Sequence, residues 1–149
     1  MNQNLETFKS KSKDTKALNL KAILIGIEFV SNGSSPLDNN LKELNGLAET
    51  AHYNVISIVS QKLTRINPKS FIGKGKVEEV SQLILQFSAG IVIFDENLSP
   101  AQNRNLENIF KCRVIDRSWL ILEIFGNHAR TREAKAQVEL ASLKYALPR

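Results

Sequence analysis

The chain has 149 residues, of which 42% are hydrophobic and 23% charged, so it can form one compact domain with a core of its own. Its formal net charge of +5 favours polyanionic partners without identifying one. The single cysteine, Cys112, excludes an internal disulfide and a cysteine-cluster zinc site, and no apolar run is long enough to span a bilayer. We therefore expect a cytoplasmic protein without a secretory signal.

Hydrophobic patterning predicts strands that alternate with helices behind a polar N-terminal segment. Residues 1–20 are rich in Lys, Asn, Ser and Thr and have no sustained period, which indicates a flexible lead-in. Short apolar runs are typical of strands that are buried on both faces, and they occur at 22–27, 55–59, 91–94 and 114–115. Apolar residues at helical spacing predict helices between these runs, at 41–51, 77–87 and 99–110.

Local signals place the ends of several helices. Ser99, Pro100 and Gln102 have the order of an N-cap, a first helical residue and a capping box. Gly90 lies just beyond the helix at 77–87, and Ser118 is the expected start of a short buried helix. Residues 131–147 form a longer helix with a wide apolar face, and such a face requires a partner segment, which we expect downstream of this sequence.

This order of elements predicts an α/β fold, with a parallel four-stranded sheet flanked by helices and followed by a long C-terminal helix. We divide the chain into the lead-in at 1–20, the α/β domain at 21–129 and the long helix at 130–149. Functional loops of such sheets lie at the carboxyl ends of the strands. Here those loops are 28–37, 60–76, 95–99 and 116–118.

The glycine-lysine segment before the helix at 77–87 is the sharpest candidate for a binding site. Gly73, Lys74, Gly75 and Lys76 follow a stretch that carries lysines and arginine but no acidic residue from position 61 onward. Glycines allow the backbone to approach a phosphate closely, and lysines add charge. The spacing is not that of a Walker A loop, and a solvated turn is the alternative interpretation.

A second basic group surrounds the junction of the sheet and the last helix. Its members are Arg117, Arg130, Arg132 and Lys135. Arginine forks suit phosphates, whereas the alternative is pairing within the chain. The glutamates considered for such pairing are Glu123, Glu133 and Glu139.

Two carboxylates, Asp95 and Glu96, end the apolar run at 91–94 in the manner of a Walker B strand. With the glycine-lysine segment they would form a nucleotide-binding, weakly ATP-hydrolysing site. Because no P-loop is present, we favour a structural role for both carboxylates.

Several stretches together resemble the N-terminal region of the HflX family of ribosome-associated GTPases. They are residues 71–79, 94–107, 114–125, 129–141 and 147–149, and the resemblance extends from about Leu20 to the end. Two positions depart from the family pattern: His128 stands where an arginine is more common, and Ala134 where a glycine is common.

The resemblance implies an α/β domain, a helical hairpin whose first arm is the helix at 131–147, and a downstream G domain outside this sequence. It implies that the whole protein binds the large ribosomal subunit and its rRNA and acts on stalled or idle ribosomes under stress. GTP and Mg²⁺ would belong to the G domain, so we expect no cofactor, metal or catalytic residue here. A regulatory scaffold for the G domain is an alternative. The expected RNA contacts are Gly73, Lys74, Gly75, Lys76, Arg117, Arg130, Arg132 and Lys135.

Overall fold

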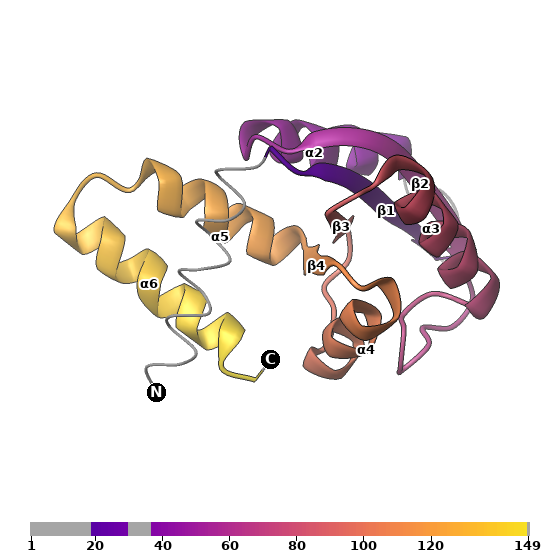
Figure 1. The fold of residues 1–149 in the computed structure, drawn as a ribbon. Coiled ribbons are helices and arrows are strands. Elements are labelled where there is room, and N and C mark those ends of the chain that lie inside the picture. Colours follow the sequence, from indigo (N-terminus) through magenta and orange to yellow (C-terminus); the bar gives the residue numbers. More distant parts are fainter. Residues whose placement is uncertain (1–18, 30–36, 149) are drawn as a thin grey trace.

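A four-stranded parallel sheet forms the centre of the molecule in a computed structural model that describes residues 19–29 and 37–148 (Figure 1). The predicted lead-in therefore lies almost wholly outside the described residues. The strand order is β2-β1-β3-β4, and every neighbouring pair is parallel. The predicted α/β class and its four parallel strands are confirmed. The strands are β1 (Lys21–Phe29), β2 (Asn54–Leu63), β3 (Ile91–Phe94) and β4 (Arg113–Asp116).

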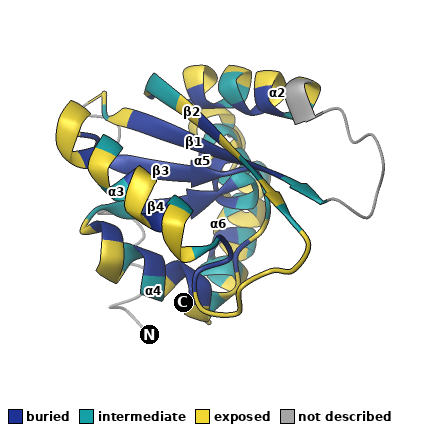
Figure 2. Cartoon of the chain, turned by 90° about the vertical axis from the view of Figure 1, so that its right-hand side faces the viewer, coloured by how far each residue is buried: buried dark blue, intermediate teal, exposed yellow. Residues whose placement is uncertain are grey.

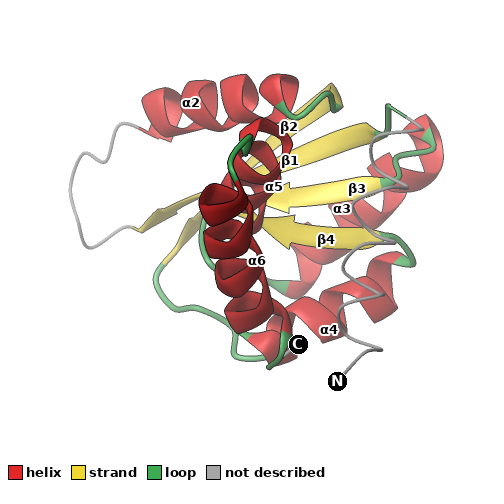
Figure 3. Cartoon of the chain, turned by 90° about the vertical axis from the view of Figure 1, so that its left-hand side faces the viewer, coloured by secondary structure: helices red, strands yellow, loops and turns green. Residues whose placement is uncertain are grey.

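Helices cover both faces of the sheet. One face packs against α2 (Leu37–Thr50) and α5 (Arg117–His128), and the other packs against α3 (Lys74–Phe87) and α4 (Pro100–Phe110). The last helix, α6 (Arg132–Ala146), lies outside α5 and contacts it (Figure 3). The chain winds outward from β1 to β2 and then returns to β3, so the direction of winding reverses between β1 and β3. Open α/β sheets bind ligands beside this switch point, at the carboxyl ends of the strands.

The two central strands explain why the sheet is stable. Residues of β1 from Ala22 to Ile25 are fully buried, and so is every residue of β3, as the blue centre of Figure 2 shows. Successive side chains point to opposite faces: Ile23 and Ile25 join the core under α3 and α4, whereas Leu24 joins the core under α2 and α5. Each such side chain contributes about 1.5–3 kcal/mol through burial.

Several element ends differ from the sequence prediction. β2 continues to Leu63, beyond the predicted end at position 59, because it pairs with β1 along its whole length. The left-handed residue that ends α3 is Ser88 rather than Gly90. Asp116, not Ser118, caps α5: its carboxylate accepts a hydrogen bond from the Trp119 amide. The predicted capping box at the start of α4 is confirmed, with both reciprocal hydrogen bonds present.

The apolar face of α6 divides into a packed and an exposed half. Tyr145 contacts Trp119 of α5 with 5.2 Å between ring centroids, and Val138 lies over Gly126. On the other flank Leu140 and Leu147 are more than half exposed. α5 therefore supplies part of the partner that we expected, downstream of this sequence, for the apolar face of α6. No helix within the described ranges combines the length and the apolarity that a bilayer crossing requires.

Candidate nucleic-acid interface

The predicted glycine-lysine segment forms the start of α3. Gly73 is the N-cap with an extended backbone, and Lys74, Gly75 and Lys76 are the first helical residues, so the helix begins three residues before the predicted position 77. The backbone there is ordinary, since no described glycine has a positive φ. A methyl group on Gly75 would meet no atom within 4 Å, and one on Gly73 would meet only the amide nitrogen of the Gln61 side chain, at 3.5 Å. Internal packing therefore requires neither glycine, and this surface is open to a partner.

The two lysines of this segment differ in their surroundings. Lys74 is exposed. Lys76 pairs with Glu79 one turn further along the helix, with 2.8 Å between Nζ and Oε2. A partner's phosphate must compete with Glu79 for Lys76 but meets no such competition at Lys74.

The second basic group is split by the fold. Arg130 in the turn between α5 and α6, and Arg132 and Lys135 in the first residues of α6, are exposed. This turn and α3 lie at opposite sides of the molecule: α3 faces the viewer in Figure 2, and α6 does so in the opposite view of Figure 3. The structure therefore does not bring the two predicted contact groups onto one surface.

Arg117 is held inside the chain, at the switch point of the sheet. Its Nε donates to Oδ1 of Asp95 at 2.9 Å, and its Nη2 also contacts that oxygen. Nη2 donates to the Asn40 carbonyl at 3.2 Å, and Nη1 lies 3.3 Å from Oε1 of Glu43. The pairing partners are thus Asp95 and Glu43, and not the glutamates considered from sequence. With all three guanidinium nitrogens in use, Arg117 fastens α5 to β3 and α2 rather than presenting a free fork to RNA.

The carboxylates of the nucleotide alternative belong to the same cluster. Asp95 is buried and paired with Arg117. Burial, and secondarily the neighbouring Asp95, raise the pKa of Glu96, with Arg117 acting in the opposite direction. Within the described residues no group of three His, Cys, Asp or Glu side chains could hold a metal ion. Because Asp95 is buried and its carboxylate is paired with Arg117, the geometry favours the structural role that we assigned to it.

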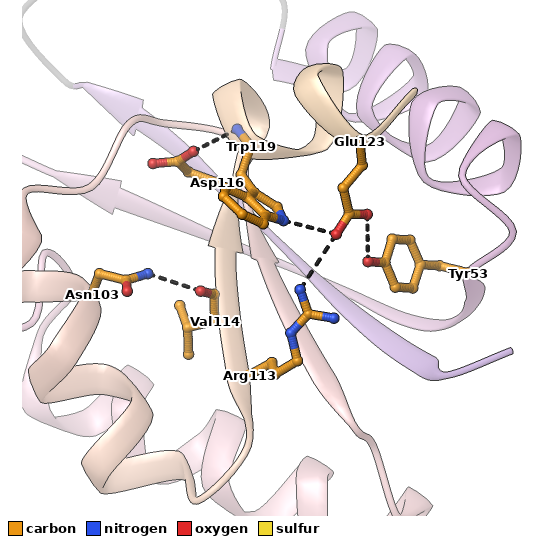
Figure 4. A network of polar contacts seen from close by, with 7 residues as sticks. All are labelled: Tyr53, Asn103, Arg113, Val114, Asp116, Trp119 and Glu123. Carbon is orange, nitrogen blue, oxygen red and sulfur yellow. Dashed lines mark hydrogen bonds and ion pairs between the residues drawn. The ribbon is translucent and has the colours of Figure 1, made fainter. Parts of the chain in front are cut away.

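A buried polar network fixes the middle of α5, and sequence patterning did not reveal it (Figure 4). Glu123 accepts hydrogen bonds from the Tyr53 hydroxyl and from Trp119 Nε1, both at 2.7 Å, and lies 3.3 Å from Nη2 of Arg113. The only local signal was the spacing of Trp119 and Glu123, which places both on one helix face. The network joins α5 to β4 and to the residue just before β2.

Comparison with known proteins agrees with this architecture. The family model for the GTP-binding GTPase N-terminal region matches residues 38–126. GTPase HflX of Flavobacterium psychrophilum is 41% identical over 129 residues, which cover 87% of this chain and 31% of that protein. GTPase HflX of Escherichia coli is 40% identical over 129 residues, which cover 87% and 30%. A solved GTP-binding protein of the archaeon Sulfolobus solfataricus, in complex with GDP, gives a TM-score of 0.65 at 31% identity, with coverage of 87% of this chain and 37% of that one.

The fold and the matched region define the chain as an N-terminal α/β domain of the GTP-binding GTPase class, and it belongs to that family. Its relatives within the class are HflX GTPases, so the resemblance to the HflX N-terminal region is confirmed. The chain spans only 31% and 30% of the length of these two relatives.

Proposed function

We propose that this chain is the ribosome-docking part of an HflX-type GTPase that works in the cytoplasm on stalled or idle ribosomes. In this proposal it binds rRNA of the large subunit and has no GTPase activity of its own, because GTP and Mg²⁺ are bound by the G domain of the whole protein. The observation that carries the proposal is a set of exposed cations. Within residues 19–29 and 37–148, none of Lys74, Arg130, Arg132 and Lys135 takes part in an ion pair.

Unpaired cations suit a phosphate backbone, whose contacts supply affinity and registration rather than base identity. Each phosphate neutralised releases counterions, so affinity falls steeply with salt. Four contacts correspond to a loss of about 100-fold between 50 and 200 mM salt. We expect Lys76 to add a weaker contact, since it already pairs with Glu79.

The test is co-sedimentation of the chain with purified large ribosomal subunits across a salt series. A triple variant, Arg130→Ala, Arg132→Ala and Lys135→Ala, should bind more weakly and lower the salt slope by about 2–3. The control removes two exposed lysines elsewhere, Lys42→Ala on α2 and Lys144→Ala on α6, and the two variants are compared per charge removed. Absence of binding by the unaltered chain at low salt would contradict the docking proposal.

A second candidate, a scaffold for the G domain, is favoured by apolar side chains that are exposed on the helical pair. Phe125 of α5, Leu140 of α6 and Leu147 at the C-cap of α6 are 58%, 55% and 56% exposed. This candidate expects the chain to bind a separately supplied HflX G domain but not large subunits. The double variant Leu140→Ser with Leu147→Ser should then abolish binding of the G domain, and retained binding would argue against the scaffold.

A further inference from the structure

The loop between β2 and α3 is closed on itself by its backbone. The Asn67 amide donates to the Phe71 carbonyl at 3.1 Å, and the Phe71 amide donates back to the Asn67 carbonyl at 2.8 Å. Inside this ring the Asn67 side chain accepts from the Lys69 amide at 2.8 Å and from the Ser70 amide at 3.3 Å. An Asx side chain that bonds amides two and three residues ahead stabilises a tight turn. The loop therefore has a defined shape without a partner.

The closing residue of the loop is strained. Phe71 has a φ of 63°, which is an outlier for a bulky side chain. Across it the Ile72 amide donates to the Ser70 carbonyl at 2.7 Å, which makes a three-residue turn of the rare positive-φ kind. Burial offsets the strain, since Phe71 is 3% exposed and packs edge-on against Phe94 of β3. Strain that the surroundings enforce is found most often at functional sites.

Side chains from two other elements hold the loop against the domain. Gln102 of α4 donates to the Asn67 carbonyl at 2.9 Å, and Asn105 of α4 donates to the Lys69 carbonyl at 3.2 Å. Gln61 of β2 accepts from the Gly73 amide at 3.3 Å. These bonds act on the backbone of the loop and leave the side chains of Arg65, Ile66, Pro68 and Lys69 exposed.

The side chains so presented are two cations and two apolar groups. Arg65, Pro68 and Lys69 are exposed, and Ile66 is 46% exposed. Among the described residues neither Arg65 nor Lys69 is in an ion pair. The printed sequence has no acidic residue from position 61 to position 77. In sequence order the two apolar residues lie between the two cations, and the hydrogen bonds of the loop define its shape without a ligand.

We propose that residues 65–70 are a preorganised RNA-binding element, in which Arg65 and Lys69 contact phosphates and Ile66 and Pro68 contact the bases of unpaired nucleotides. This rests on the proposed function, which did not include these residues. Unpaired nucleotides are required because stacked bases of an A-form helix hide their faces from side chains. Asn67 and Asn105 are positioning residues: they hold the loop and do not touch the RNA. Preorganisation strengthens binding because little conformational entropy remains to be lost.

The experiment measures affinity of the full chain for purified large ribosomal subunits across a salt series. Arg65→Ala with Lys69→Ala should weaken binding about tenfold at low salt and reduce the salt slope by about 1.4–1.8, since two phosphate contacts are lost. Asn105→Ala removes a hydrogen bond that holds the loop, so it should weaken binding about threefold and accelerate hydrogen exchange of the loop amides. Because it removes no charge, the salt slope should not change. Lys42→Ala with Lys144→Ala is the control of equal charge.

Competition identifies the ligand class. Single-stranded poly(U) should displace the unaltered chain from subunits at least tenfold more effectively than fully paired RNA, and Ile66→Ser should remove this preference. Equal displacement by poly-L-glutamate would overturn the RNA assignment in favour of an acidic protein segment. If Arg65→Ala with Lys69→Ala behaves like the control while the triple variant at 130, 132 and 135 loses binding, the loop inference fails and the proposed function stands. If the unaltered chain does not bind subunits, both fail.

Discussion

Replacement of Asp116 by alanine should destabilise the domain more than loss of any exposed helix cap. Asp116 is fully buried at the end of β4, and its two oxygens serve two elements: Oδ1 accepts from the Trp119 amide and Oδ2 from the Leu98 amide, both at 3.1 Å. Loss of the α5 cap costs about 1 kcal/mol. Loss of a charge-assisted hydrogen bond in the interior costs about 1.5–3 kcal/mol. Asp116→Ala should therefore lower the free energy of unfolding by about 2.5–4 kcal/mol.

Urea unfolding provides the assay, with fluorescence of the single tryptophan, Trp119, as the probe. The midpoint should fall while the m-value stays constant, because the folded and unfolded states keep their surface areas. Ser99→Ala is the matched control, since Ser99 caps α4 on the exposed surface, and it should cost about 1 kcal/mol. If Asp116→Ala costs no more than Ser99→Ala, the assignment of Asp116 as a shared interior acceptor is wrong.

Three further predictions concern other groups. Phe71→Ala should lower the free energy of unfolding in urea by about 3–5 kcal/mol. Phe71→Gly should lower it by no more, although it removes more of the side chain, because glycine adopts the positive φ of 63° without strain. A clearly larger loss for the glycine variant would contradict this. The raised pKa of Glu96 means that the folded state binds the proton of this carboxyl group more tightly than the unfolded state does. Ionisation of Glu96 therefore lowers the free energy of unfolding; this loss is absent below the ordinary pKa of 4.5 and grows as the pH rises through the folded-state value. Glu96→Gln should accordingly raise the urea midpoint at pH 7, and this advantage should disappear at pH values below the ordinary pKa. Burial, with a smaller contribution from Glu107, raises the pKa of the Cys112 thiol to about 11, so iodoacetamide should modify Cys112 slowly at pH 8 in the folded chain and much faster in urea.

Sequence patterning located the sheet because its central strands are covered on both faces. The runs at 22–27 and 91–94 are short, continuous and apolar. Such runs are typical of strands that are buried on both faces. The capping box of Ser99 and Gln102 was equally visible, since all of its bonds lie within four residues. Local chemistry was therefore sufficient wherever the determining contacts were local.

The features that sequence did not reveal depend on contacts between distant positions. Tyr53 and Glu123 are 70 positions apart, and Arg117 and Asp95 are 22 apart, so neither pair could be deduced from spacing. β2 continues beyond position 59 through polar residues. An edge strand needs one apolar face at most, so the apolar run by which we recognised strands ends before β2 does. The positive φ of Phe71 occurs at a residue type that rarely adopts it, and burial against Phe94 offsets the strain.

The two candidate contact regions are each held rigidly to the sheet, and this favours an extended partner. α5, which leads into the turn that carries Arg130, is fastened at its start by Arg117, through Asp95 and Glu43, and in its middle by Glu123. The loop after β2 is fastened by α4. Because these regions lie at opposite sides of the molecule (Figure 1), a small ligand cannot reach both. A folded RNA has a continuous phosphate chain that can pass from one region to the other, and its contacts to each region would then strengthen binding at the other through effective concentration.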